Sequence, residues 1–311
     1  MIPVLSCKEA FLLDQITIDS GHLSEKILMD NAGRSLAQFI IEYIDDPFNQ
    51  QFVILAGPGN NGGDGIICHH YLLKYGANSK LILLNADSKS CWIFNEYSIH
   101  EDSVTMYSNV DKYSPNNWYI DGIFGIGLKQ NILGDYKTII QNISEFPNVI
   151  SIDVPSGIYG DSGMGAGNII QAKYTLTMGY PKLGHYFNVG LESTGDLFVL
   201  DIGFKPPKST EIYIQNIEFQ DACACTPTYV RNMHKYSRGK VISIAGSSGY
   251  TGACILAVDS ALTSGAGIMK VLVPKSLMNL YESCLTEAIM VPMNDHDTGA
   301  FISDNIDRIL S

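Results

Sequence analysis

The chain has 311 residues, 46% hydrophobic and 17% charged, a composition typical of a soluble globular protein long enough for two domains. Acidic residues outnumber basic ones by 32 to 20, and the net charge of −12 argues against a broad nucleic-acid-binding surface. The N-terminus lacks the pattern of a secretory signal, and no apolar run approaches the ~20 residues of a membrane span. The seven cysteines, an odd number, favour free thiols in a cytoplasmic protein.

Two helices are predicted at the start of the chain. Ser6 and Glu9 have the spacing of a capping box and predict a helix over residues 6–19. Ser24 is placed to cap a second helix over residues 25–44, where apolar residues recur at helical spacing. This second helix is expected to face the core.

After Pro47, short apolar runs alternate with helical stretches. The runs predict strands over residues 52–56, 81–85, 118–121, 149–153, 174–178 and 197–201. Such alternation predicts βαβ units in a largely parallel, doubly wound, Rossmann-like α/β sheet. Ligands of these sheets bind beyond the carboxyl ends of the strands, near the point where the strand order reverses.

The segment over residues 57–65, Gly-Pro-Gly-Asn-Asn-Gly-Gly-Asp-Gly, follows the first of these runs. Its five glycines predict a loop with positive φ angles, whose backbone N–H groups approach an anion at the start of a helix from Ile66. A turn that only solves a packing problem is the alternative, but Asn60, Asn61 and Asp64 add oxygens that suit sugar hydroxyls or a hard cation. The spacing matches neither a P-loop nor a dehydrogenase fingerprint, so the expected ligand is another phosphorylated small molecule.

Two later strands end in aspartate. Asp121 opens into the glycine-containing segment 122–131, and Asp153 opens into Val-Pro-Ser-Gly over residues 154–157. Either aspartate alone could simply cap a following helix. Together with residues 57–65, however, they give three polar segments on one edge of the predicted sheet, which favours a binding site there.

Cysteine and histidine patterns do not predict a metal site. Cys223 and Cys225 are the only close cysteine pair, and no second pair at ligand spacing accompanies them. His69 and His70 are expected on the surface of a helix.

A second α/β unit is predicted in the C-terminal part. Residues 240–245 form a predicted strand, 246–252 a glycine-rich loop, 253–263 a helix, 268–273 a strand and 275–284 a helix. Two βα units are fewer than a domain usually has, so this unit is expected to be incomplete.

These motifs closely resemble the NAD(P)H-hydrate epimerase (YjeF N-terminal) family over roughly residues 1–215. The resemblance rests on residues 57–65, 121–128 and 153–158, on Gly-Tyr-Pro-Lys at 179–182 and on Asp-Ile-Gly at 201–203. From His234 to Gly267 the chain resembles the start of the ADP-dependent NAD(P)H-hydrate dehydratase domain, which is ribokinase-like. The resemblance implies an epimerase domain over residues 1–218 and a truncated dehydratase domain over residues 225–311.

In this family the first domain interconverts the R and S forms of hydrated NADH or NADPH, called NAD(P)HX, and the second dehydrates the S form using ADP (or ATP). The resemblance implies a potassium ion held by Asn61, Asp121 and Ser156, which would offset a pyrophosphate lying next to carboxylates. The implied substrate contacts are Asn60, Asn61, Gly62, Gly63, Asp64, Gly125, Ile126, Gly127, Leu128, Lys129, Gln130, Asn131, Asp153 and Ala253.

Asp153 is the candidate catalytic residue, since epimerisation needs a proton donor and acceptor beside the nicotinamide. A role as general acid would require burial or a neighbouring carboxylate to raise its ordinary pKa of about 3.9. The alternative is that Asp153 only hydrogen-bonds the ligand.

Three further expectations follow. Dehydratase activity should be negligible, because no Gly-Thr-Gly-Asp anion hole follows Gly267. A noncatalytic nucleotide-binding or scaffold protein of the same fold is the main competing interpretation, and a sugar-kinase-like transferase ranks third. Formation of homo-oligomers is left open.

Overall fold

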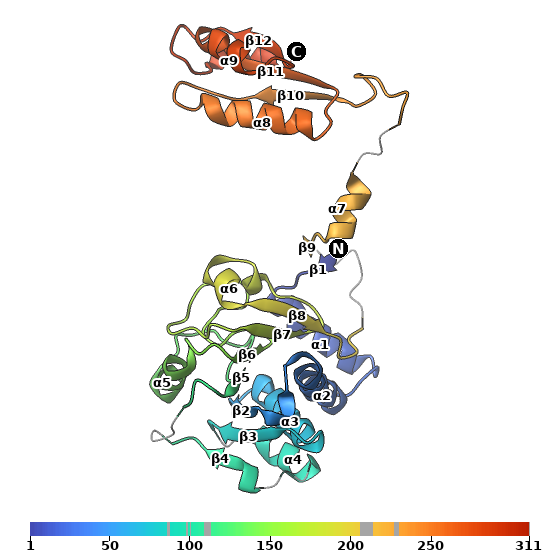
Figure 1. The fold of residues 1–311 in the computed structure, drawn as a ribbon, viewed down its shortest axis with the longest axis vertical. Helices are drawn as coiled ribbons and strands as arrows, with labels where there is room; N and C mark the ends of the chain where they lie inside the picture. The colour runs from blue at the N-terminus through green and yellow to red at the C-terminus, as the bar shows by residue number, and fades with distance from the viewer. Residues whose placement is uncertain are drawn as a thin grey trace. The chain divides into compact units, whose positions relative to one another are not determined.

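The structure is a computed structural model that describes residues 1–85, 88–97, 99, 101–108, 113–205, 214–226 and 230–310. The chain folds as two compact units, Met1–Phe219 and Gln220–Ser311 (Figure 1). Each unit is built around a parallel sheet of its own.

A seven-stranded parallel sheet forms the centre of the first unit. Its strand order is β4-β3-β2-β5-β6-β7-β8, so the chain starts in the middle, moves outward to β4 and returns to β5 on the other side of β2. The strands are β2 (Gln51–Ala56), β3 (Asn78–Leu83), β4 (Val104–Met106), β5 (Trp118–Gly122), β6 (Val149–Ile152), β7 (Tyr174–Met178) and β8 (Asp196–Leu200). The predicted α/β class and Rossmann-like, doubly wound sheet are confirmed.

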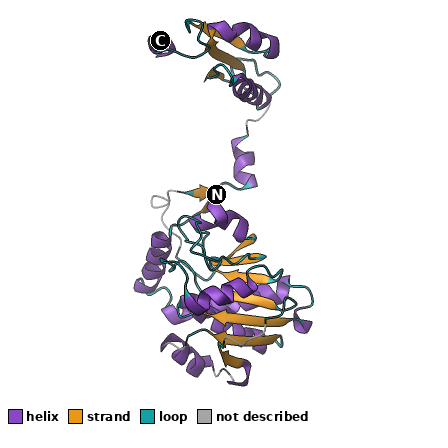
Figure 2. Ribbon diagram, turned by 90° about the vertical axis from the view of Figure 1, so that its left-hand side faces the viewer, coloured by secondary structure: helices purple, strands orange, loops and turns teal. Residues whose placement is uncertain are grey.

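Helices cover both faces of this sheet, as Figure 2 shows. Phe52 and Ile54 of β2 point into the cluster that contains α2 and α3, whereas Val53 and Leu55 point into the cluster that contains α5. Strand residues therefore alternate between two hydrophobic layers. The helices are α1 (Cys7–Asp19), α2 (Glu25–Tyr43), α3 (Asn60–Lys74), α4 (Ser88–Tyr97), α5 (Gly134–Ile143) and α6 (Asn188–Ser193).

The two N-terminal helices begin where their caps predict. Ser6 accepts a hydrogen bond from the backbone N–H of Glu9, whose carboxylate accepts one from the Ser6 N–H, so the capping box is complete. Ser24 accepts from the N–H of Ile27 at the start of α2. A short antiparallel pair, β1 (Ile2–Pro3) with β9 (Gln215–Asn216), joins both ends of the first unit.

The glycine-rich segment is not the loop that its composition predicts. Helix α3 begins at Asn60, so the glycines at 62, 63 and 65 lie in its first two turns. Within residues 57–65, all of which the structure describes, no glycine has a positive φ angle. A Cβ on Gly62 would lie 1.9 Å from the carbonyl oxygen of Gly57, and one on Gly57 would lie 2.0 Å from that of Ile123. These glycines therefore serve close backbone packing rather than left-handed conformations.

His69 also differs from its prediction. It is fully buried on α3, where its two ring nitrogens contact the hydroxyl oxygens of Ser79 at 2.8 Å and Ser103 at 3.0 Å. The surface prediction is wrong for His69 because α3 is enclosed between α2 and the sheet over most of its length.

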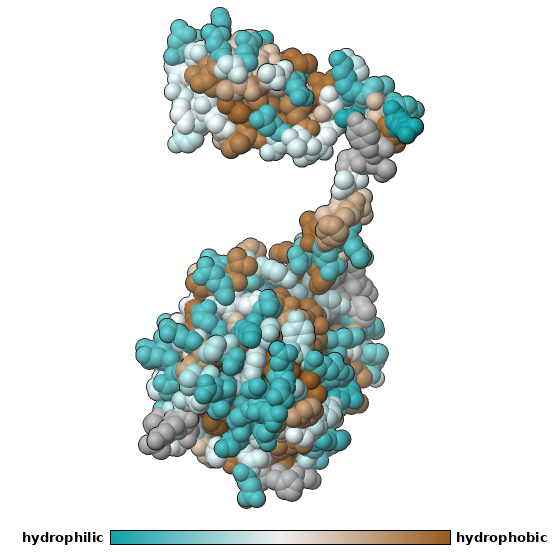
Figure 3. All heavy atoms as spheres, viewed as in Figure 1, coloured by the Kyte–Doolittle hydropathy of each residue, from teal (hydrophilic) through white to brown (hydrophobic). Residues whose placement is uncertain are grey.

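The second unit contains a parallel sheet of order β10-β11-β12 and a small core around Val258, Val271 and Tyr281. Strand β12 follows the last predicted helix and was not expected. Apolar side chains at 241, 242, 244, 256 and 289 remain exposed, and Figure 3 shows hydrophobic surface gathered on this unit. Its elements are α7 (Phe219–Cys225), which starts at the boundary, β10 (Lys240–Ile244), α8 (Thr251–Thr263), β11 (Ile268–Pro274), α9 (Met278–Cys284), β12 (Ile289–Met293) and α10 (Ile306–Leu310).

None of the helices in the described residues has both the length and the hydropathy that crossing a bilayer requires.

The packing of α3 against the segment before it gives a direct test. Gly62→Ala should destabilise the first unit by about 1–3 kcal/mol or more, because the new methyl group meets rigid backbone. Gly59→Ala is the matched control, since a Cβ there meets nothing within 4 Å and should change stability by at most about 0.5 kcal/mol. Urea denaturation of the two variants measures the difference, and equal effects would contradict the packing role.

Candidate functional site

A cavity of about 610 Å³ opens at the carboxyl ends of β2, β5 and β6. Its walls come from α1, α2, the start of α3, the segment after β5 and the segments that follow β6 and β7. This is where the strand order reverses, the usual ligand-binding position of a doubly wound sheet.

Asp121 and Ser156 form a hydrogen-bonded pair that also contacts Ile123 and Phe124 of the cavity wall. The Ser156 hydroxyl donates to Asp121 Oδ1 at 2.6 Å, and the Ser156 backbone N–H donates to Oδ2 at 2.8 Å. Ser151 Oγ and the backbone N–H of Ile123 also donate to this carboxylate. Asp121 is completely buried, and burial raises its pKa despite the hydrogen bonds. All four donors are uncharged, and the raised pKa means that burial disfavours the charged form of Asp121.

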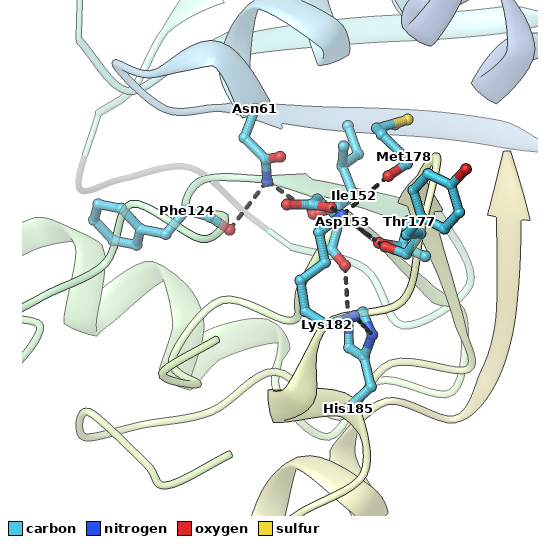
Figure 4. Close-up of polar contacts among 9 residues, drawn as sticks. Asn61, Phe124, Ile152, Asp153, Thr177, Met178, Lys182 and His185 are labelled. Atoms are coloured by element: carbon cyan, nitrogen blue, oxygen red, sulfur yellow. Dashed lines mark hydrogen bonds and ion pairs between the residues drawn. The ribbon is translucent and has the colours of Figure 1, made fainter. Parts of the chain in front are cut away.

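Asn61 links the start of α3 to the two neighbouring strand ends. Its side-chain nitrogen donates to the carbonyl oxygens of Ile152 at 2.8 Å and Phe124 at 3.0 Å, as Figure 4 shows. The Phe124 backbone N–H donates to Ser156 Oγ at 2.9 Å. Asn61, Asp121 and Ser156 therefore belong to one hydrogen-bonded network across three strand ends.

Asp153 is held in an unusual conformation directly after β6. Its φ angle of 66° is left-handed, which is uncommon for a residue with a side chain and is typical of functional sites. The backbone is held on both sides, since the Asp153 N–H donates to the Leu176 carbonyl at 2.8 Å and the Asp153 carbonyl contacts His185 Nε2 at 2.8 Å. The conformation turns the peptide chain away from the sheet at the cavity wall.

The Asp153 carboxylate forms a buried ion pair with Lys182. The distance from Lys182 Nζ to Asp153 Oδ1 is 2.5 Å, and both side chains are nearly inaccessible to solvent. Lys182 Nζ also donates to Thr177 Oγ1 and to the Met178 carbonyl, while Thr177 donates to the same Asp153 oxygen (Figure 4). All three ammonium donors of Lys182 therefore have an acceptor.

The ion pair decides the ionisation state of Asp153. Burial by itself would raise the pKa of this carboxyl group, but the Lys182 ammonium and the Thr177 hydroxyl hold the pKa below its ordinary value. Asp153 is thus an ionised carboxylate at neutral pH. The condition for a general acid, a raised pKa, is not met at this residue, although a role as proton acceptor is compatible with it.

His185 contacts the backbone of both members of the Asp153–Lys182 ion pair. Its Nδ1 accepts a hydrogen bond from the Lys182 backbone N–H at 3.1 Å, which leaves the proton on Nε2 for the Asp153 carbonyl. Burial and the nearby Lys182 ammonium lower the pKa of His185 to about 4. A neutral imidazole with a fixed tautomer therefore ties the Asp153 backbone to the Lys182 backbone.

The structure distributes the predicted substrate contacts unevenly. Those that line the cavity are Asn60, Asn61, Asp64, Gly125, Ile126, Gly127, Leu128 and Asp153. Lys129, Gln130 and Asn131 line an adjoining depression of about 340 Å³ that shares Gly127 and Leu128 with it. Gly62 and Gly63 are buried in α3 and do not line the cavity, because they pack against Gly57 and Met29. Ala253 lies on α8 in the second unit.

Sequence reasoning missed Lys182, Thr177 and His185 as site residues. Lys182 stands in the Gly-Tyr-Pro-Lys segment directly after a predicted strand, so its place at the sheet edge was available from the sequence. Its partner was not, because 29 residues separate Lys182 from Asp153 and only the pairing of β6 with β7 brings them together.

Comparison with known proteins agrees with this site. The profile of the family described as YjeF-related protein N-terminus matches residues 25–184, which include the cavity residues from α3, β5 and β6 and the ion pair. The chain belongs to the YjeF N-terminal family. An NAD(P)H-hydrate epimerase of Oenococcus oeni is 32% identical over 65% of this chain and 98% of its own length.

Longer relatives match both units. A bifunctional NAD(P)H-hydrate repair enzyme of Dictyoglomus turgidum is 35% identical over 91% of this chain and 57% of its own length. The chain thus spans somewhat more than half the length of such relatives. The crystal structure of the yeast protein ynu0 shares the fold, with a TM-score of 0.53 and 23% identity over 63% of this chain and 87% of that chain.

The buried ion pair of this YjeF-type site predicts a strong coupling. Lys182→Met should cost about 3–5 kcal/mol of unfolding free energy, because it leaves the Asp153 carboxylate buried without a counter-charge. The double variant Asp153→Asn with Lys182→Met should lose much less than the sum of the single variants. Urea denaturation at pH 7 measures all three.

Lys26→Met is the matched control, because the Lys26–Glu96 pair of 2.8 Å is exposed and should contribute at most about 1 kcal/mol. The pKa of Asp153 is lowered, so the stabilisation by the buried pair should be present above the ordinary aspartate pKa and be lost as the pH falls through the lower folded value. Additive effects of the two buried substitutions would contradict the coupling.

Proposed function

We propose that the first unit epimerises the R and S forms of NAD(P)H hydrate. The observation that carries the proposal is an ionised carboxylate, Asp153, paired with a buried ammonium at the wall of a cavity at the switch point of the sheet. The names of relatives that match this unit over nearly their whole length support the same reaction.

The start of α3 offers binding groups for the dinucleotide. Gly59 is the N-cap of this 15-residue helix and provides no capping side chain, and the positive end of the helix dipole there would favour a pyrophosphate. Asn60 and Asp64 line the same part of the cavity and supply polar groups that suit ribose hydroxyls.

Potassium is part of the proposal, and the network of Asn61, Asp121 and Ser156 suits it chemically. Carboxylate, hydroxyl, amide and carbonyl oxygens are the ligands that hard cations prefer. The raised pKa of Asp121 means that burial disfavours its negative charge more than the four hydrogen bonds favour it. A bound cation would neutralise that charge and bind the three strand ends together under the anionic substrate.

Asp153 and Lys182 have distinct proposed roles in the reaction. Epimerisation requires that the hydroxyl group on the ring carbon leave and that water return on the other face, or that the ring open and close. The ionised Asp153 accepts the proton of the incoming water or of the hydroxyl group. Lys182 keeps Asp153 ionised, and the His185 contact keeps its backbone in place.

The noncatalytic alternative makes an opposite prediction about the same residues. The buried ion pair contributes to stability in either case, but an ionised carboxylate at the wall of the ligand cavity is a group that a proton-transfer site needs and a binding module does not. The contacts of Asp153 therefore favour the enzyme. A cytoplasmic location fits metabolite repair and forms part of the proposal.

Epimer exchange provides the central test. Purified chain should re-equilibrate R and S NADHX, followed by chromatography, and Asp153→Asn should lower kcat by about 10²–10⁴-fold because the proton acceptor is gone. Unchanged kcat with a raised KM would instead assign Asp153 to binding alone. Absence of exchange by the unaltered chain would favour the noncatalytic alternative.

A second test concerns the cation. Exchange should be faster in potassium chloride than in chloride of a smaller or bulkier cation at equal ionic strength, and Asp121→Asn should remove the difference. Thermal unfolding should show the same preference, since an ion that binds only the folded state raises the transition temperature. Equal rates and equal transition temperatures in all salts would refute the potassium site.

The dehydratase prediction remains a prediction. Ala253 sits near the N-terminus of α8, and the second unit would contribute to hydrate binding there if the family resemblance holds. ADP-dependent recovery of NADH from the S hydrate by this chain would contradict the expectation of negligible dehydration.

A further inference from the structure

Four carboxyl groups line the cavity, those of Asp14, Glu25, Asp64 and Asp153, and the epimerase proposal assigns no role to Asp14 or Glu25. Asp14 lies on α1 and lines the cavity together with Asp153 and Lys182. It is on the helix face with Ala10 and Ile18, one turn away on either side, and both of these also line the cavity. The first helix therefore presents one acidic side chain to an otherwise largely apolar wall.

The environment of Asp14 differs from that of the other aspartates at the site. Asp121 and Asp153 each accept several hydrogen bonds, whereas Asp14 makes no hydrogen bond or close ion pair with any residue in the described part of the chain. A half-buried carboxyl group without such partners, open to a ligand cavity, is available to react with what enters.

The charge on Asp14 is disfavoured. Burial, reinforced by the carboxylates of Asp153 and Glu25 and opposed by the Lys182 ammonium, raises the pKa of Asp14 to about 6 from its ordinary value of 3.8. Asp64 also borders the cavity. Two carboxyl groups of one cavity are thus pushed in opposite directions, since the Lys182 ammonium holds Asp153 ionised. Such separation is how enzymes assign the acid and the base within a pair of carboxyls.

We propose that Asp14 is the proton donor of the epimerisation, a catalytic residue that acts together with Asp153 in the same cavity. The inference rests on the proposed epimerase function. It supplies the group that Asp153 is unable to provide.

With Asp14 as proton donor and Asp153 as proton acceptor, the reaction takes up and releases no net proton. Protonated Asp14 gives its proton to the hydroxyl group on the ring carbon, the C–O bond breaks, and water leaves while the ring nitrogen lone pair forms a C=N bond. A water molecule adds to the carbon from the other face, its proton goes to Asp153, and the C=N electron pair returns to nitrogen. The proton then passes from Asp153 through water to Asp14, so nothing is oxidised or reduced.

Asp14→Asn is the decisive variant, because it keeps size and removes the acid. It should lower kcat for epimer exchange by about 10²–10⁴-fold with KM changed by less than about threefold. Asp19→Asn, at an exposed carboxyl on the same helix, should leave both within about twofold. In the unaltered chain, kcat should fall as the pH rises above the pKa of Asp14. This fall should be absent in the residual activity of Asp14→Asn.

Stability provides a readout that does not depend on activity. A raised pKa means that the folded unaltered chain loses stability as the pH rises from about 4 to about 6, because the charged form is disfavoured. Asp14→Asn escapes this loss, so its transition temperature should exceed that of the unaltered chain at pH 8 and not at pH 4. A purely structural role for Asp14 predicts a lower transition temperature at both pH values.

The outcomes separate the two proposals. If the unaltered chain exchanges epimers and Asp14→Asn does so with nearly the same kcat and pH profile, Asp14 is not the donor and the epimerase proposal stands. If the unaltered chain fails to exchange epimers, both proposals fall. A loss of kcat in Asp14→Asn together with a lower transition temperature at pH 8 also counts against the donor role, since disruption of the wall then explains it.

Discussion

The close approach of three backbone segments at the centre of the sheet underlies the rest of the first unit. Gly57, the residue after β2, packs against the carbonyl oxygen of Ile123. Gly62 of α3 packs against the carbonyl oxygen of Gly57, and neither position has room for a side chain. This contact places the start of α3 directly over the ends of β5 and β6. The Asn61 amide is then within reach of both neighbouring strand ends, and the cavity forms above them. The chemistry at the site thus depends on backbone packing that only glycine permits.

Three aspartates of the first unit, one on helix α1 and two at strand ends, acquire different electrostatic properties. Asp121 meets only uncharged donors and has a raised pKa, Asp153 meets an ammonium group and has a lowered pKa, and Asp14 meets mainly apolar wall and has a raised pKa. The three differences follow from burial and from a single lysine. These properties suit the roles that we propose for the three residues: a cation ligand, a proton acceptor and a proton donor.

Much of this fold was predictable because its signals are local. The capping box at Ser6, the alternation of strands and helices after Pro47 and the aspartate after β6 each depend on a few consecutive residues, and the structure reproduces them closely. The conformation at residues 57–65 was not predictable, because a glycine that relieves backbone contact and a glycine with positive φ are identical in sequence. His69 was misplaced for a similar reason, since its burial comes from packing of α2 and β3 around α3.

The site shows the same contrast between features that local sequence predicts and features that depend on packing of distant segments. Residues at strand ends could be expected to converge, since a parallel sheet aligns its carboxyl edges. The partnership of Asp153 with Lys182 depends on strand pairing across 29 residues, and the altered pKa of Asp14 depends on a helix that reaches the sheet from the N-terminus. Sequence therefore indicated where the chemistry lies, while the ionisation states required the assembled cavity.

The buried pair also constrains how the protein can evolve. Loss of Lys182 alone leaves a buried carboxylate without a counter-charge, and loss of Asp153 alone leaves a buried ammonium without one, so either single change should lower stability. Descendants should therefore keep both residues or replace both within a short interval. A lineage that exchanged the pair for two neutral side chains would retain the cavity while losing the carboxylate that we propose accepts a proton.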